Sequence, residues 1–184
     1  MRLALVLLLV ALVAVGGLWL WAGRAAHRPG SLAWRAVDRD LAARFADVPT
    51  TTTAALAAHL ADSTVAPVLL DARTEAEYAV SHLPGAHRVD PDASAAELAD
   101  ALDGIDRQRS VVVYCSVGVR SGAVARRLQS AGFEHVENLA GSIFRWANEG
   151  RPLVRDGHPV EEVHPYDAVW GRLLDPGRRA GGSE

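Results

Sequence analysis

The chain has 184 residues, with 22 acidic side chains against 19 basic ones that are all arginine. The absence of lysine excludes Schiff-base chemistry, a pyridoxal-phosphate anchor and a Walker-type phosphate loop, because each of these needs an ε-amine. The net charge of −3 argues against a nucleic-acid partner, since a phosphate backbone requires a basic surface. The sole cysteine, Cys115, excludes an internal disulfide, a CxxC redox pair and a thiolate-rich zinc site.

An apolar run without charged side chains occupies residues 3–23, which is long enough for the ~20-residue helix that crosses a bilayer. We expect an uncleaved membrane anchor in contact with lipid; a secretory signal peptide is the alternative. Arginines at positions 24, 28 and 35 favour a cytoplasmic C-terminal side. The sequence therefore predicts a single-pass membrane protein whose domain faces the cytoplasm, with a periplasmic or exported domain as the alternative.

The chain after this run is long enough for one domain with flanking segments. Residues 24–51 are predicted to form a juxtamembrane amphipathic helix and a linker, because apolar side chains recur at helical spacing from Ser31 to Val48. The globular domain is predicted to span residues 52–154, beginning with a threonine-capped helix over Ala54–Leu60.

The first half of this domain alternates strand and helix signals. The apolar run Val68–Leu70 predicts a buried strand that ends at Asp71. Two capping boxes, Thr74 with Glu77 and Ser94 with Glu97, predict the starts of helices that run through Val80 and Leu102. A short strand over His87–Val89 is expected between them.

The second half repeats the alternation. Val111–Tyr114 is the most β-biased segment, and it is followed by helices predicted over Ser121–Ala131 and Ser142–Asn148. Alternating strands and helices predict an α/β fold with a parallel sheet covered by helices on both faces.

Candidate chemistry lies in the turn from Cys115 to Arg120, directly after strand Val111–Tyr114. Ligands of open α/β sheets bind at the carboxyl ends of strands. Backbone N–H groups of the turn, with Gly118 free to adopt a positive φ, and the dipole of the following helix would favour a thiolate. Arg120 would lower the pKa of Cys115 further and make it a nucleophile. A buried, inert cysteine is the alternative interpretation.

The chain from about residue 52 to 153 resembles the rhodanese-like domain family. The resemblance rests on four stretches in a fixed order, which are Val68-Leu69-Leu70-Asp71-Ala72-Arg73 with Glu77-Tyr78, Ser81-His82-Leu83-Pro84-Gly85-Ala86, Tyr114-Cys115-Ser116-Val117-Gly118-Val119-Arg120-Ser121, and Asn138-Leu139-Ala140-Gly141-Ser142-Ile143 with Trp146 and Gly150-Arg151-Pro152.

This resemblance implies a rhodanese-like fold and a sulfurtransferase in which Cys115 carries the transferred sulfur as a persulfide. It implies thiosulfate or a persulfide as donor, a thiol or cyanide as acceptor, a small-molecule or protein partner in each role, and no cofactor. The active-site loop would be Ser116, Val117, Gly118, Val119, Arg120 and Ser121. The C-x4-R spacing fits a sulfur atom, whereas related phosphatases and arsenate reductases use a longer C-x5-R loop.

Three further residues are candidates for supporting the loop. Asp71 and Arg73 follow a strand and could orient the Cys115 loop; a buried ion pair that holds the turn is the equal alternative. His82 lies in the resemblance motif, where a structural histidine is favoured over a proton donor. No metal site is expected, because the chain has no HxH or HxxxH pair.

The tail, residues 155–184, is aromatic and apolar between His164 and Leu174. We expect this part to dock on its own domain, with binding of a partner protein as the alternative, and we expect a disordered end from Asp175. A second function class stays open as well, namely a non-catalytic partner-binding or sulfur-carrier module.

Overall fold

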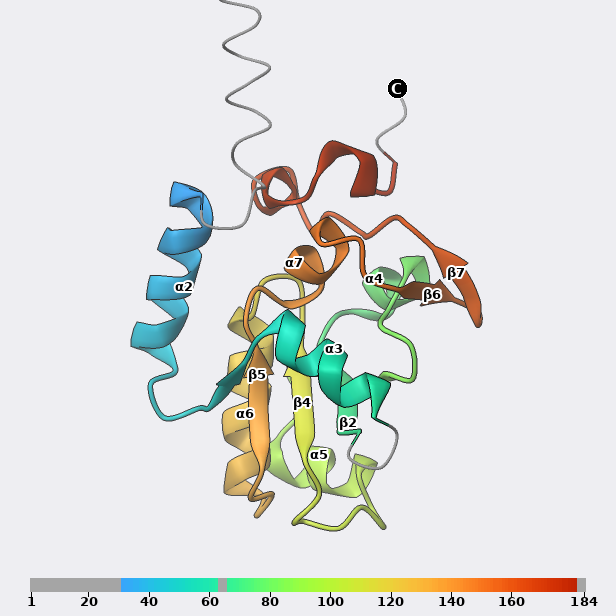
Figure 1. Cartoon of the computed structure of the whole chain (residues 1–184). Helices are drawn as coiled ribbons and strands as arrows, with labels where there is room; N and C mark the ends of the chain where they lie inside the picture. The colour runs from blue at the N-terminus through green and yellow to red at the C-terminus, as the bar shows by residue number, and fades with distance from the viewer. Residues whose placement is uncertain (1–30, 63–65, 182–184) are drawn as a thin grey trace, which may run out of the picture.

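The computed structural model describes residues 31–62 and 66–181 (Figure 1). Its helices are α2 (Leu32–Arg44), α3 (Thr53–Ala61), α4 (Glu75–Val80), α5 (Ala95–Ala101), α6 (Val119–Ser130), α7 (Ser142–Asn148), η1 (Trp170–Leu173) and η2 (Pro176–Arg178). Its strands are β1 (Thr50–Thr51), β2 (Val68–Asp71), β3 (His87–Arg88), β4 (Val111–Tyr114), β5 (Val136–Leu139), β6 (Leu153–Arg155) and β7 (His158–Val160).

Five strands form a parallel sheet in the order β1-β5-β4-β2-β3, and β6 and β7 form a separate antiparallel hairpin. Strand β4 lies in the middle, with Val113 in register with Leu70 of β2 on one side and Asn138 of β5 on the other. The predicted parallel α/β sheet is confirmed. Because β4 is central, the loop that follows it emerges at the middle of the sheet's carboxyl edge.

The sheet has a hydrophobic core on each face. Alternate residues of β4 point to opposite sides, as in any strand: Val112 and Tyr114 belong to one core, and Val111 and Val113 belong to the other. Helix α7 covers the first face with Ile143, Phe144 and Trp146, whereas α5 and α6 cover the second with Leu98, Val124 and Leu128. The predicted cover on both faces is therefore confirmed.

Both predicted capping boxes are present, at Thr74–Glu77 and at Ser94–Glu97. In each, the hydroxyl of the N-cap residue accepts from the N3 amide and the glutamate accepts from the N-cap amide, which satisfies two helix-end donors. These local signals place α4 and α5 where the sequence predicts them.

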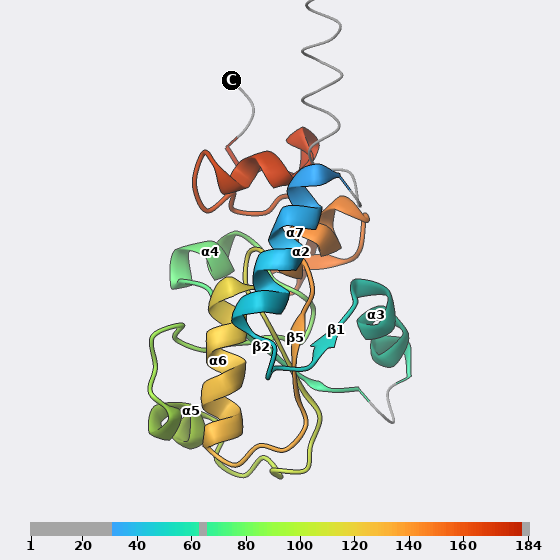
Figure 2. The ribbon, with the colours of Figure 1, turned by 90° about the vertical axis from the view of Figure 1, so that its left-hand side faces the viewer.

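Helix α2 packs along the domain beside the N-terminal end of α6 (Figure 2). Its Trp34 is fully buried in the core under α7, while Leu41 and the following Phe45 are buried in the core under α6. Arg145 stacks on the Trp34 ring and pairs with Asp38 at 2.9 Å, which fixes the helix from its outer side. The helix is an integral part of the folded unit.

The segment after β7 crosses the carboxyl edge of the sheet, above α7 (Figure 1). Leu173 and Leu174 are buried in the same core as Trp146, and Asn148 of α7 donates to the Leu173 carbonyl at 2.7 Å. The sequence predicted disorder from Asp175. Instead, residues 175–181 contain η2, and Ala180 N–H donates to the Val163 carbonyl, because Val163 is fully buried and anchors this last turn.

The longest helix of the described residues, α2, has 13 residues and spans only ~20 Å, whereas a bilayer core needs about 30 Å. Within residues 31–62 and 66–181, none of the helices has the length and apolar character of a membrane span. This finding overturns the predicted single-pass membrane localisation. The apolar run 3–23, from which that localisation was inferred, lies outside the described residues.

Candidate active site

Cys115 lies at the carboxyl end of β4, and the turn Ser116–Gly118 leads directly into α6. The helix begins at Val119, two residues before its predicted start, with Gly118 as N-cap. Gly118 has φ +122°, a conformation that a residue with a Cβ rarely adopts, and a Cβ built there would lie 2.8 Å from Leu41 Cδ1. A larger residue at this turn would therefore also require the Leu41 side chain of α2 to shift.

The sulfur of Cys115 has two polar groups within hydrogen-bond distance. The Gly118 N–H donates at 3.2 Å, and the Ser121 hydroxyl lies 3.4 Å away. Both donors come from the loop and the first turn of α6, where the helix dipole adds partial positive charge. The predicted contact of the loop with the cysteine is present.

The backbone of Cys115 is held by α7 on the other side. The Cys115 N–H donates to Ser142 Oγ at 3.1 Å, while Ile143 and Phe144 donate their N–H groups to the carbonyls of Cys115 and Ser116. N–H groups in the first turn of a helix have no carbonyl partner within the helix, and here the carbonyls of the loop serve as their acceptors. The nucleophile position is thereby fixed between the N-terminal ends of two helices.

Burial raises the pKa of the Cys115 thiol, because the side chain is only 1 % exposed and a thiolate loses its hydration there. The hydrogen bonds from Ser121 and Gly118 and the charge of Arg120 outweigh burial, and the net pKa lies below that of an ordinary thiol. The site is therefore built to stabilise a thiolate at low solvent exposure.

Arg120 is held by Glu77 of α4. Its two terminal nitrogens donate to the two carboxylate oxygens at 2.7 Å each, and one of them also donates to Ser116 Oγ at 2.9 Å. The Glu77 side chain is 3 % exposed and the Arg120 side chain 22 %. Burial raises the pKa of Glu77, but the Arg120 guanidinium, together with the hydrogen bonds from Thr74, lowers it more, to about 2. The Arg120 charge is therefore balanced by a carboxylate at all ordinary pH values.

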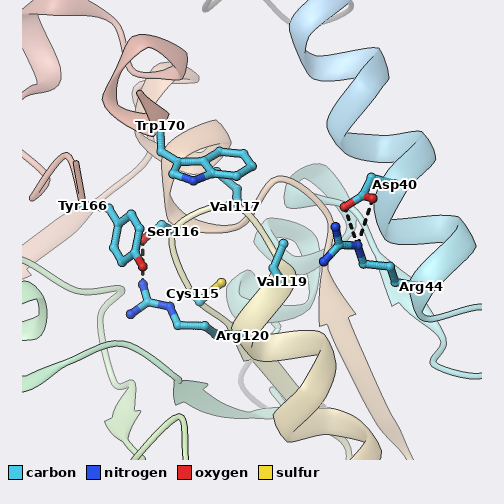
Figure 3. Close-up of a pocket in the computed structure, with 9 residues that line it drawn as sticks. All are labelled: Asp40, Arg44, Cys115, Ser116, Val117, Val119, Arg120, Tyr166 and Trp170. Atoms are coloured by element: carbon cyan, nitrogen blue, oxygen red, sulfur yellow. Dashed lines mark hydrogen bonds and ion pairs between the residues drawn. The ribbon is translucent and has the colours of Figure 1, made fainter. Parts of the chain in front are cut away.

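A cavity of about 190 Å³ opens above the sulfur. Its floor and sides are loop residues, with Asp40 and Arg44 of α2 on one side and Tyr166 and Trp170 of the C-terminal segment on the other (Figure 3). The Tyr166 ring lies 4.8 Å from the Arg120 guanidinium carbon, and Asp40 pairs with Arg44 at 2.9 Å. Helix α2 and the C-terminal segment, which are distant in sequence, thus form opposite sides of the pocket. Both cations of the pocket, Arg44 and Arg120, are paired with carboxylates.

Most of the site residues predicted from the sequence meet here. Cys115, Ser116, Val117, Val119 and Arg120 line the cavity, and Gly118 and Ser121 bind the sulfur from below.

The three candidates for supporting residues lie elsewhere. Arg73 and Asp71 form a fully buried ion pair at 2.6 Å, and Arg73 also donates to the Ser81 carbonyl, which holds the turn after β2. The ring of His82 stacks on Tyr78 at 3.8 Å, and its Nδ1 lies 3.1 Å from the Tyr78 carbonyl. None of the three lines the cavity above Cys115.

Sequence reasoning missed other residues of the site. Glu77 was recognised only as a capping residue, although its position in the Asp71–Tyr78 stretch was a signal. Asn138, which is buried beside Ser121, stood in the fourth family-like stretch without an assigned role. Nothing in the sequence indicated that α2 and the tail would line the pocket through Asp40, Arg44, Tyr166 and Trp170.

Comparison with known proteins gives one consistent result. The family model described as Rhodanese-like domain matches residues 52–149. A sulfurtransferase of Allochromatium vinosum is 35 % identical over 87 residues, which are 47 % of this chain and 78 % of the relative. The probable adenylyltransferase/sulfurtransferase MoeZ of Mycobacterium tuberculosis is 32 % identical over 46 % of this chain, but this match spans only 21 % of that longer protein. The solution structure of the rhodanese-like domain of the Anabaena protein Alr3790 aligns with TM-score 0.52 and 26 % identity, covering 59 % of this chain and 80 % of that one.

Proposed function

Because the chain belongs to the rhodanese-like domain family, we propose that it is a sulfurtransferase that works through a persulfide on Cys115. The observation that carries the proposal is the sulfur of Cys115 at the floor of a cavity, bound by the Gly118 N–H and the Ser121 hydroxyl. A buried structural cysteine would need neither a cavity above it nor donors around its sulfur.

The first half-reaction is attack of the Cys115 thiolate on the outer sulfur of the donor. A new S–S bond forms on Cys115 as the S–S bond of the donor breaks, and the donor leaves as sulfite or as a thiolate. In the second half-reaction, a thiolate or cyanide attacks the outer sulfur of the persulfide, and Cys115 leaves again as a thiolate. No external oxidant or reductant is consumed, and the thiolate that starts the cycle is also its leaving group.

The loop serves both steps in the same way. Hydrogen bonds from Gly118 and Ser121 stabilise negative charge on the Cys115 sulfur, which is present before the first attack and develops again in the second. The Glu77–Arg120 pair holds the Ser116 side of the loop, since Ser116 Oγ donates to Glu77 Oε1 at 3.0 Å. Ser116, Val117 and Val119 then line the space next to the sulfur.

The charges of the pocket favour a persulfide donor over thiosulfate. Thiosulfate is a dianion and needs cations that are not already neutralised. Arg120 is paired with Glu77 in bidentate geometry, and Arg44 is paired with Asp40. The remaining walls, Val117, Val119 and Trp170, suit the organic part of an alkyl persulfide. The donor and acceptor can be small molecules or the cysteine of a partner protein that reaches the cavity.

Transfer to cyanide tests this proposal. The full chain and a Cys115→Ser variant are incubated with thiosulfate or with an alkyl persulfide, freed of donor, and then mixed with cyanide. We expect the wild-type chain to release about one equivalent of thiocyanate with the persulfide donor and less with thiosulfate, and the variant to release none, because the persulfide can form only on this thiol. Equal release by Cys115→Ser would exclude the mechanism, and no release by either chain would favour a non-catalytic binding module.

A further inference from the structure

The Ser121 hydroxyl has one proton and two acceptors. Its oxygen lies 2.7 Å from Asn138 Oδ1 and 3.4 Å from the Cys115 sulfur, and both contacts are buried. A hydroxyl can donate to only one of them at a time, although its lone pairs can accept from a thiol as well. Which of the two receives this single proton therefore depends on how strong a hydrogen-bond acceptor Asn138 Oδ1 and the Cys115 sulfur each are.

Asn138 contacts both residues that donate to the sulfur. Its Oδ1 accepts from Ser121, and its Nδ2 donates to the Gly118 carbonyl at 2.9 Å. The side chain is 1 % exposed and comes from β5, the strand paired with β4. The same amide thus fixes the peptide and the hydroxyl that bind the Cys115 sulfur.

Two hydrogen-bond arrangements follow. While Cys115 keeps its proton, the S–H donates to Ser121 Oγ, and the Ser121 hydroxyl donates to Asn138 Oδ1, so all three groups are satisfied. When the proton has left to solvent or to another base, the hydroxyl turns to the thiolate, and Asn138 Oδ1 loses its donor. A buried acceptor without a donor costs free energy, which falls on the thiolate state alone.

We propose that Asn138 is a positioning residue for sulfur transfer, which sets whether the Ser121 proton faces the Cys115 sulfur or the amide oxygen. The position of the proton is argued from the hydrogen bonds alone, and only its consequence for sulfur transfer rests on the proposed function. In the thiolate the hydroxyl stabilises the nucleophile; once the sulfur carries a second sulfur atom and its negative charge has moved outward, the hydroxyl returns to Asn138. Asn138 thereby takes the Ser121 hydrogen bond away from the Cys115 sulfur when the persulfide forms, and gives it back when the thiolate is regenerated.

Other charged and titratable groups lie around Cys115. Of these, the charge of Arg120 of α6 lowers the pKa of Cys115. Asp40 and Arg44 of α2 and Tyr166 of the C-terminal segment also line the cavity, and Glu77 of α4 lies behind Arg120 as its partner. None of them contacts Asn138 in the described part of the chain. A double-mutant cycle between Asn138 and Ser121 leaves their contributions unchanged and isolates the shared proton.

The test is the pH dependence of Cys115 alkylation by iodoacetamide in the full chain, without any sulfur donor. The cycle compares wild type, Asn138→Ala, Ser121→Ala and the double variant. We expect Asn138→Ala to lower the alkylation midpoint more in the presence of Ser121 than in its absence, by about half to one pH unit, which is the effect of one hydrogen bond. Any effect through the Gly118 carbonyl is present in both backgrounds and cancels.

Asn148→Ala is the matched control, because Asn148 also binds backbone groups through both ends of its amide but lies at the far end of α7. It should leave the midpoint unchanged. Should Asn138→Ala lose the fold, Asn138→Leu, which keeps the shape without polar atoms, replaces it in the same cycle. Equal shifts of the midpoint in both backgrounds, a difference of opposite sign, or an equal shift in Asn148→Ala would overturn the inference. Since no donor is present, this result is independent of whether the chain transfers sulfur.

Discussion

Glu77 is the residue whose loss should change the site most without touching Cys115. Five hydrogen bonds end on its carboxylate, two from Thr74, one from Ser116 and two from Arg120. Glu77→Gln keeps the shape of the side chain, but its amide nitrogen must face a donor of Arg120 and it leaves a guanidinium that is only 22 % exposed without a countercharge.

The magnitude follows from the pKa of about 2, compared with 4.5 for an ordinary glutamate. A depression of this size corresponds to about 3 kcal/mol of stability at neutral pH, within the range for a buried pair that loses one partner. Because the folded pKa is lowered, this contribution is fully present above about pH 4.5 and is lost as the pH falls toward 2. The stability difference between wild type and Glu77→Gln should therefore vanish over that interval.

Urea unfolding of the full chain, followed by tryptophan fluorescence, measures this difference. Glu97→Gln is the matched control, since Glu97 occupies the same place in the second capping box but, among the described residues, binds only Ser94 and is solvent-exposed. Glutamine also serves in a capping box, so this control should unfold close to wild type. If both variants lost similar stability, or if the Glu77→Gln difference were independent of pH, the pairing of Glu77 with Arg120 would not be what stabilises the loop.

Two further predictions concern the walls of the site. Gly118→Ala should cost about 2–4 kcal/mol of stability, because backbone strain at φ +122° adds to a clash with Leu41. Gly132→Ala, with φ +92° and open space around its Cβ, should cost about 1 kcal/mol in the same unfolding assay. Equal losses would refute the close packing of α2 on the loop. Tyr166→Ala should speed alkylation of Cys115 by a bulky maleimide but not by iodoacetamide, as the ring forms one side of the cavity, and an unchanged ratio of the two rates would show that the C-terminal segment does not restrict access.

The sequence predicted the parts of this molecule that local rules determine. The β-rich run Val111–Tyr114 became the central strand, and the two capping boxes started their helices at the predicted residues. The boundary of α6 differed because Gly118, which the sequence marked only as conformationally free, itself caps the helix.

What the sequence could not predict depends on contacts between distant segments. Glu77 lies 43 positions from Arg120, and its capping role gave a sufficient local reason for a glutamate there. The contribution of Tyr166 to the cavity depends on how the tail crosses the sheet edge, which is fixed by the burial of Val163 and Leu174. Helical periodicity predicted α2, but not which of its side chains would face the loop.

The central claim, that Cys115 carries the transferred sulfur, is tested most directly by the intact mass of the full chain after incubation with an alkyl persulfide and removal of the donor. We predict a gain of one sulfur atom, located on Cys115 by peptide mapping, lost on addition of cyanide, and absent in Cys115→Ser. A wild-type chain that keeps its mass while its thiol remains open to alkylation would contradict the account.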